Sequence, residues 1–135
     1  MRKVSIVLIS FLIYFSSPCL SQERIKEANI KSIDQHYHSC LDKGENMLGC
    51  SITYYHEMDS CLNIAYKQLR KKLNEPSKIA LKKEQLAWLK ARDHKFSEID
   101  AAYKGDVQDN KMFRFDEKAN FVRWRTIVLL ERNLK

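Results

Sequence analysis

The residues of this sequence best able to bind a metal or form a nucleophile–base pair are its four cysteines and four histidines. Two of the histidines and one cysteine lie together in the segment His36-Tyr-His-Ser-Cys40, and both residue types are common zinc ligands. On a helix, however, only His36 and Cys40 share a face, because residues two apart point in different directions. His56 and His94 lie in other segments, and nothing in their spacing requires them to converge. We therefore expect no metal site and no cofactor.

The sequence also lacks the motifs that position catalytic groups. It contains no GxSxG elbow, no HExxH motif and no glycine-rich phosphate loop. No histidine is placed so as to activate Cys61, and carboxylates on helical surfaces are ordinary solvating groups. We expect a protein that is not an enzyme.

The segment EQLAWLKARD, residues 84–93, places polar groups where a helix should be apolar. At 3.6 residues per turn, one helical face carries the following side chains: Leu81, Gln85, Trp88, Leu89, Arg92, Phe96, Ile99 and Tyr103. A second polar strip, made of Asp59, Asn63 and Tyr66, follows the edge of the preceding apolar stripe. The expected role is structural, with Gln85 and Arg92 locking two helices together through this strip, and with Asp59 or Asp93 pairing with Arg92. The alternative is that the polar strip lines a groove for a ligand.

Sparse glycines and prolines divide the chain into four segments with helical periodicity. The breaks fall at Gly44 and Gly49, at Pro76 and at Gly105. They predict helices near residues 24–42, 47–74, 77–104 and 110–134. Because the connections are short, consecutive helices should fold back on one another. The predicted fold is an all-α, antiparallel hairpin bundle of about four helices.

The last predicted helix is apolar on two nearly opposite sides. One stripe runs through Met112, Phe115, Ala119, Val122, Leu130 and Leu134, and the other comprises Phe113, Phe121, Trp124 and Val128. Such a helix is either sandwiched within its own fold or has a partner. The second stripe is therefore a candidate partner surface, and a homodimer is one form that the partner could take.

Three cysteines follow the N-terminal segment. Cys40 ends the first predicted helix and Cys50 opens the second, so a disulfide between them would staple the hairpin and stabilise it by about 2–3 kcal/mol. Cys61 is eleven residues beyond Cys50 on the same helix, about 16 Å away, and cannot bond to it. We expect Cys61 to be a small buried apolar side chain, with an intermolecular disulfide as the alternative.

The N-terminus has the pattern of a secretory signal peptide. Two basic residues precede a twelve-residue apolar run, Val4 to Phe15, and a mostly small-residue exit ends at Ser21. We expect residues 1–21 to be removed and residues 22–135 to form a single periplasmic or secreted domain with a net charge of +5. Lipoprotein processing at Cys19 is an alternative that Pro18 disfavours. The charge is spread along the chain without the block of like charges expected of a nucleic-acid arm, so we expect no nucleic-acid partner. No second apolar run is long enough to cross a membrane, so we expect no membrane partner after cleavage.

The chain resembles the LprI-type lysozyme-inhibitor domain of secreted bacterial proteins. The resemblance rests on an ordered set of residues between about 40 and 130: Cys50, Asp59-x-x-Leu62-Asn63, Tyr66, Leu81, Gln85, Trp88, Arg92-Asp93, the segment Phe96 to Gly105, and Val122-Arg-Trp-Arg125. It implies an extracytoplasmic helical domain that blocks lysozyme, with Asp59, Asn63, Tyr66, Gln85, Trp88, Arg92 and Asp93 as signature positions. In many members a cysteine follows the Arg-Asp pair, whereas here Phe96 stands in that region. Cys61 is an addition to the pattern.

Charge raises an objection to the inhibitor function. Many lysozymes are basic, so an inhibitor with a net charge of +5 would be repelled at long range. Inhibition would need a local acidic patch, for which the candidates are Asp100, Asp106, Asp109, Asp116 and Glu117. The two functions left open are a binding inhibitor of a cell-wall hydrolase and a periplasmic assembly module that uses the apolar surface of the last helix.

Overall fold

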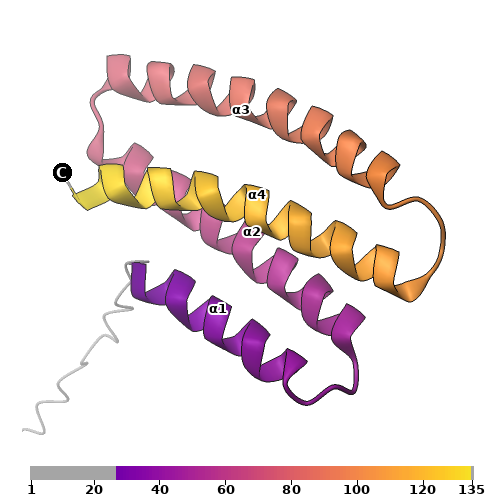
Figure 1. Cartoon of the computed structure of the whole chain (residues 1–135). Helices are drawn as coiled ribbons and strands as arrows, with labels where there is room; N and C mark the ends of the chain where they lie inside the picture. The colour runs from indigo at the N-terminus through magenta and orange to yellow at the C-terminus, as the bar shows by residue number, and fades with distance from the viewer. Residues whose placement is uncertain (1–26, 135) are drawn as a thin grey trace, which may run out of the picture.

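A computed structural model of the chain describes residues 27–134, which form four α-helices and no strand (Figure 1). The helices are α1 (Glu27–Leu41), α2 (Met47–Lys72), α3 (Glu75–Ala102) and α4 (Gln108–Leu134). The all-α prediction is confirmed, and the predicted helices overlap the observed ones closely. The expected signal peptide, with Cys19, lies outside the described residues.

Asparagine side chains start the two helices at the centre of the chain. Asn46 caps α2 by accepting a hydrogen bond from the backbone N–H of Gly49 at 3.0 Å, and Asn74 caps α3 through the N–H of Ser77 at 3.0 Å. Gly49 leaves room for its cap, since an added Cβ would lie 2.3 Å from the Asn46 amide nitrogen. Pro76 lies in the first turn of α3, where a missing N–H costs nothing.

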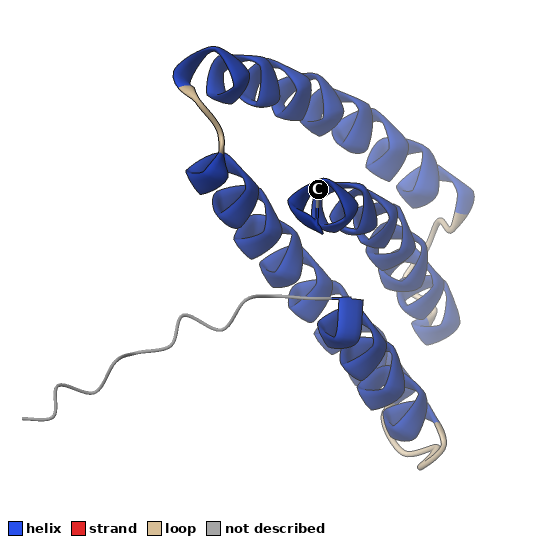
Figure 2. Cartoon of the chain, turned by 90° about the vertical axis from the view of Figure 1, so that its left-hand side faces the viewer, coloured by secondary structure: helices blue, strands red, loops and turns tan. Residues whose placement is uncertain are grey.

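The core lies mainly between α2 and α4, although these helices are not neighbours in the sequence. Figure 2 shows α3 above α2 and α4, and α1 beside the lower half of α2. The fully buried side chains include Met58, Leu81, Val122, Leu129 and Leu130. The hydroxyl of Thr126 is buried at this interface but donates to the carbonyl of Val122 in its own helix at 3.0 Å, so it needs no partner on α2.

The two outer helices are held differently. A disulfide joins Cys40 at the end of α1 to Cys50 in α2, with their Cα atoms 5.8 Å apart, which confirms the predicted staple. The backbone of α3 lies near α4 rather than near α2. None of the described helices is long and apolar enough to cross a membrane.

Candidate functional site

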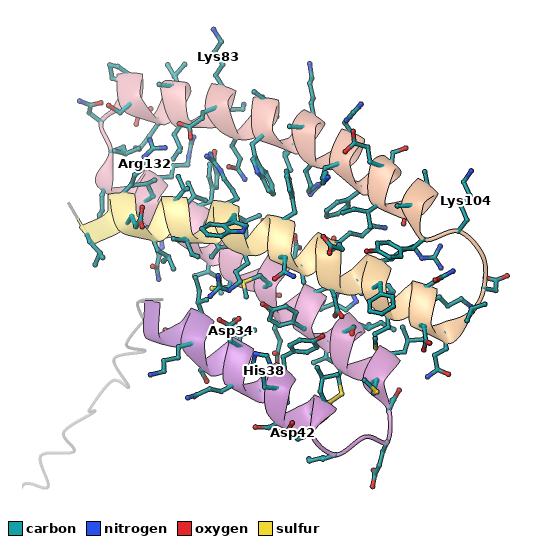
Figure 3. All side chains as sticks on the ribbon, viewed as in Figure 1. Asp34, His38, Asp42, Lys83, Lys104 and Arg132 are labelled. Carbon is teal, nitrogen blue, oxygen red and sulfur yellow. A yellow bond between two sulfur atoms is a disulfide. The ribbon has the colours of Figure 1, made fainter. Side chains whose placement is uncertain are left out.

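A buried arginine joins α4 to α3. Arg125, only 8 % exposed, donates from Nε and Nη2 to Oε1 of Gln85 at 3.0 and 2.8 Å, and from Nη1 to Oε1 of Glu84 at 2.7 Å. Arg132, two turns later, donates to both carboxylate oxygens of Glu84 at 3.0 and 2.9 Å. Figure 3 shows Arg132 on the side of α4 that faces α3. A buried guanidinium is tolerated only when it is paired and hydrogen-bonded, and α3 supplies both kinds of partner.

The electrostatics of Glu84 reflect this pairing. Burial alone would raise the pKa of the carboxyl group, but hydrogen bonds from Arg125 and Arg132, together with their charges, hold the pKa below its usual value. The ionised form is therefore favoured in the folded chain. Glu84 connects two arginines of α4 to one position of α3.

Aromatic rings continue this contact along α3. Trp88 stacks on Phe121 of α4, with ring centroids 5.8 Å apart and planes inclined by 14°, and Phe96 meets the same ring edge-on at 6.4 Å. The guanidinium carbons of Arg92 and Arg125 both lie 5.9 Å from the Trp88 ring centroid. Such cation–π contacts favour a cation held over the ring. Gln85 and Trp88 therefore fasten α3 to α4.

The predicted lock between Gln85, Arg92 and the polar strip of α2 is wrong. Gln85 bonds to Arg125, while Arg92 donates to Oδ1 of its neighbour Asp93 at 3.0 and 2.7 Å. The physical reason is that α4 covers the apolar side of α2, so the polar residues of α3 meet α4 first. The expected pairing of Arg92 with Asp93 is present.

The polar strip of α2 makes contacts within its own helix. Asn63 donates to the carbonyl of Asp59 at 2.9 Å and to its carboxylate at 3.3 Å. Tyr66 is partly buried and packs against the core. These three positions thus lie together along α2, as the spacing predicted, but within residues 27–134 no hydrogen bond or ion pair joins them to Gln85 or Arg92.

A second polar network ties α1 to α2 and α4, and sequence reasoning missed it. Asp34 on α1 accepts hydrogen bonds from Nε and Nη2 of Arg123, the latter at 2.8 Å, and from the hydroxyl of Tyr54 at 2.9 Å. Figure 3 shows Asp34 on the side of α1 nearest α4. Residues 34 and 123 are separated by 89 positions, and no local spacing relates them.

Tyrosine rings close the space beside this network. Tyr37 stacks on Tyr54 with centroids 4.4 Å apart, and the side chains of Asp116 and Ser51 lie close enough to influence its hydroxyl. Burial, reinforced by Asp116, raises the pKa of Tyr37 to about 12. Burial and the hydrogen bond to Asp34 raise the pKa of Tyr54 as well. Both hydroxyls therefore stay protonated as donors, which makes this network structural.

Cys61 is a free thiol, 3 % exposed, in the α2 core. It touches the floor of a shallow hollow of about 410 Å³ between α1 and α2. Burial raises the pKa of the thiol to about 11, so the reactive thiolate is scarce at neutral pH. The expectation of a small buried apolar side chain is confirmed.

In the His36–Cys40 segment, which resembled a zinc site in sequence, two of the candidate ligands bind other side chains. Cys40 is in the disulfide, and Nδ1 of His36 bonds to Glu57 of α2 at 2.9 Å. Across residues 27–134, no three His, Cys, Asp or Glu side chains are grouped so as to hold a metal ion.

The predicted partner surface of α4 is divided by the fold. Phe121 is partly buried against Trp88 and Phe96, so it does not belong to an open surface. Trp124 is 67 % exposed, and Phe113 and Val128 are each about 40 % exposed. Phe121 is thus sandwiched between α4 and α3, whereas Phe113, Trp124 and Val128 remain exposed, and a partner for these three stays a prediction.

A scan against protein-family models matches residues 40–129 to the family described as Lysozyme inhibitor LprI. The chain belongs to this family. Searches of curated proteins and of solved structures each gave no match. The LprI family is one of inhibitors rather than of enzymes, in agreement with the absence of catalytic motifs from the sequence.

Within this LprI domain, three of the positions expected as signature positions make contacts that hold α3 in place. Gln85 and Trp88 hold α3 to α4, and Arg92 lies over the rings of Trp88 and Phe96. The ring of Phe96 also lies 5.3 Å from the Lys118 ammonium. Aromatic packing therefore holds this part of α3 in place.

The outward side of α4 carries exposed apolar side chains of the LprI domain, the largest of them Trp124. In Figure 1, α4 crosses in front of α2, and neither α1 nor α3 covers its near side. Helical spacing places one set of exposed residues along this side: Phe113, Glu117, Asn120, Trp124, Val128 and Glu131. We call this set the Trp124 face.

The Trp124 face carries no basic residue, although the chain as a whole is basic. Four of the cations of α4 are held in ion pairs with α1 and α3: Arg123–Asp34, Arg125–Glu84, Arg132–Glu84 and Lys118–Asp100. Lys111 pairs with Asp106, and Arg114 donates to the carbonyl of Gly105. Glu117 and Glu131 flank the tryptophan at seven residues on either side. The domain thus has an acidic, aromatic surface within a cationic chain.

The acidic loop patch considered from sequence is largely neutralised. Asp100 pairs with Lys118 at 2.6 Å and Asp106 with Lys111 at 3.4 Å. Asp116 is partly buried beside Tyr37, with its Oδ1 atom lacking a hydrogen-bond partner. Of the five acids, Glu117 is the one that belongs to the Trp124 face.

Proposed function

We propose that this LprI-family protein is exported by its N-terminal signal peptide and inhibits a lysozyme-type cell-wall hydrolase. In this proposal, inhibition is by direct binding through the Trp124 face. Family membership supports the class of target. The observation that carries the choice of surface is the 67 % exposure of Trp124 on a side of α4 that, among residues 108–134, has exposed acidic but no basic residues.

The chemistry of this surface suits a basic protein. Tryptophan is enriched among the residues that dominate binding energy, and it contributes a large apolar area with few rotatable bonds. Glu117 and Glu131 provide charges opposite to those of a basic lysozyme, at the rim of the contact. The local field therefore offsets the repulsion expected from the net charge of the chain.

The first experiment measures lysozyme turnover of bacterial cell wall in the presence of purified residues 22–135 with the disulfide intact. We expect dose-dependent inhibition, and we expect Trp124→Ala to weaken it by at least about tenfold. Val107→Ser is the matched control, because Val107 is 64 % exposed in the connection between α3 and α4, away from the Trp124 face. This control should inhibit like the parent.

Charge reversal tests the acidic component separately. The pair Glu117→Lys and Glu131→Lys should weaken inhibition, and the pair Asp42→Lys and Glu45→Lys, which changes the net charge equally at the α1–α2 connection, should not. Equal loss from both pairs would mean that net charge rather than the Trp124 face controls binding. Absence of inhibition at tens of micromolar would contradict the inhibitor function itself.

A second candidate function is an assembly module, and the exposed Trp124 favours it as well. In that case the same face would bind a second copy or another cell-envelope protein. Sedimentation equilibrium over a range of concentrations would then reveal self-association that Trp124→Ala abolishes. Inhibition of lysozyme by a monomer would instead support the first function.

A further inference from the structure

The outer side of α3 is apolar and basic at once. Ile79 and Leu86 are 69 % and 51 % exposed, and they lie two turns apart on the side of α3 opposite Gln85 and Trp88. A shallow hollow of about 440 Å³ lies between them, lined by Ile79, Lys82, Lys83, Leu86, Ala87 and Lys90. Figure 3 shows Lys83 pointing away from the bundle. We call this set the Leu86 face.

The segment of the chain that leads into and carries this face is rich in basic residues. Residues 67–90, from the end of α2 to the middle of α3, contain eight basic and two acidic side chains, a net charge of +6. The two acids are already paired, Glu75 with Lys78 and Glu84 with arginines of α4. Among the described residues, Lys82, Lys83 and Lys90 are absent from the ion pairs.

The chemistry of the Leu86 face limits what can cover it. A second copy packed on this face by a two-fold axis would bring Lys82 and Lys83 against their own counterparts. A basic hydrolase would be repelled in the same way. A soluble polyanion would neutralise the lysines but would leave Ile79 and Leu86 in water. An anionic lipid surface both buries the aliphatic side chains and neutralises the lysines. The aliphatic side chains enter the acyl boundary, while the lysine ammonium groups remain among the headgroup phosphates.

We propose that the Leu86 face docks the protein on a phospholipid bilayer that carries anionic headgroups. In this arrangement α3 lies parallel to the bilayer, and Ile79 and Leu86 are its two points of insertion. A basic residue near an anionic surface strengthens binding by about fivefold, so Lys82, Lys83 and Lys90 together contribute about a hundredfold. The contact is peripheral and needs no membrane-spanning segment, and so it replaces the expectation of no membrane partner.

The proposal does not depend on the inhibitor function, because the Trp124 and Leu86 faces are on different helices. The test is co-sedimentation of residues 22–135 with vesicles of phosphatidylcholine alone or mixed with phosphatidylglycerol. We expect binding to the mixed vesicles only, weakened by salt. The double variant Lys82→Glu, Lys83→Glu should reduce the partition coefficient by at least about twentyfold, and Leu86→Ser should reduce it severalfold.

The matched control reverses two exposed lysines elsewhere, Lys31→Glu on α1 and Lys104→Glu in the α3–α4 connection, with the same change in net charge. It should bind vesicles nearly as the parent does, and thermal melts followed by circular dichroism should show all variants folded. Equal loss in the control, or binding to phosphatidylcholine alone, would overturn the proposal. So would binding that Leu86→Ser leaves unchanged and that soluble polyphosphate abolishes, because the ligand would then be a polyanion.

Discussion

The guanidinium of Arg125 on α4 donates two hydrogen bonds to a single amide oxygen of Gln85 on α3, at 3.0 and 2.8 Å. This pair explains why a core-facing stripe of α3 includes an amide. The amide oxygen accepts from a buried cation without adding a second negative charge beside Glu84. The glutamine of the EQLAWLKARD segment is thus a connector between α3 and α4.

Removing this acceptor should destabilise the fold. In Gln85→Leu, two N–H groups of the buried Arg125 lose their partner, and an unsatisfied group of this kind costs about 1–3 kcal/mol. Urea unfolding followed by circular dichroism measures the loss. The comparison is Arg92→Met, which breaks an ion pair with the exposed neighbour Asp93 and two cation–π contacts, and should cost less than about 1 kcal/mol. A larger loss for Arg92→Met would contradict the assigned roles.

The helices of this fold follow from local rules that the sequence displays directly. Breaks at Gly44, Pro76 and Gly105 and the periodicity between them placed all four helices. The disulfide followed from the closeness of Cys40 and Cys50 across a short connection. Both are relations between residues near one another in the chain, where geometry leaves few alternatives.

The contacts between distant segments could not be obtained in this way. Short connections indicated that α3 folds back on α2, but the apolar area of α4 made it the better partner for α2. Gln85 therefore met Arg125, forty residues away, instead of the strip at Asp59. The two arginines at positions 125 and 132, seven residues apart on one side of a helix, were the available signal for an acidic partner such as Glu84.

The disulfide should contribute to stability without being required for folding. The double variant Cys40→Ser, Cys50→Ser removes a closed loop of ten residues, which we expect to cost about 2–3 kcal/mol of unfolding free energy. The helical content should remain, because α1 is also held by Asp34 to Arg123 and Tyr54. Urea unfolding of the variant and of the reduced parent should agree. Complete unfolding of α1 in the variant would show that the Asp34 network cannot hold it alone.

Cys61 should report on unfolding. Because the thiol is 3 % exposed and its pKa is raised to about 11, a thiol reagent such as dithionitrobenzoate should react with native protein far more slowly than with a free cysteine. In denaturant, residues 22–135 with the disulfide closed should release one equivalent, and Cys61→Ala should release none. Fast reaction of the native protein would mean that α1 opens from α2 on that timescale, exposing the hollow between them.

Glu84 should make the free energy of unfolding depend on pH in the acidic range. Its pKa in the folded chain is lower than the ordinary 4.5, because the hydrogen bonds and charges of Arg125 and Arg132 outweigh the effect of burial. The unfolded chain therefore takes up this proton at a higher pH than the folded chain does. The stabilisation is complete above about pH 4.5 and is lost as the pH falls through the lowered value.

The variant Glu84→Gln tests this direction of the pH dependence. Its amide oxygen can still accept hydrogen bonds from the arginines, but the side chain carries no charge. At neutral pH we expect the free energy of unfolding of the parent to exceed that of the variant by about 1 kcal/mol. The value is modest because the Glu84 side chain is 43 % exposed. The difference should shrink as the pH falls below 4.5. Glu45→Gln, in the α1–α2 connection, is the control and should follow the parent. A difference that stays constant with pH would mean that Glu84 acts through packing, and the ion pairs with α4 would then contribute little to holding α3 in place.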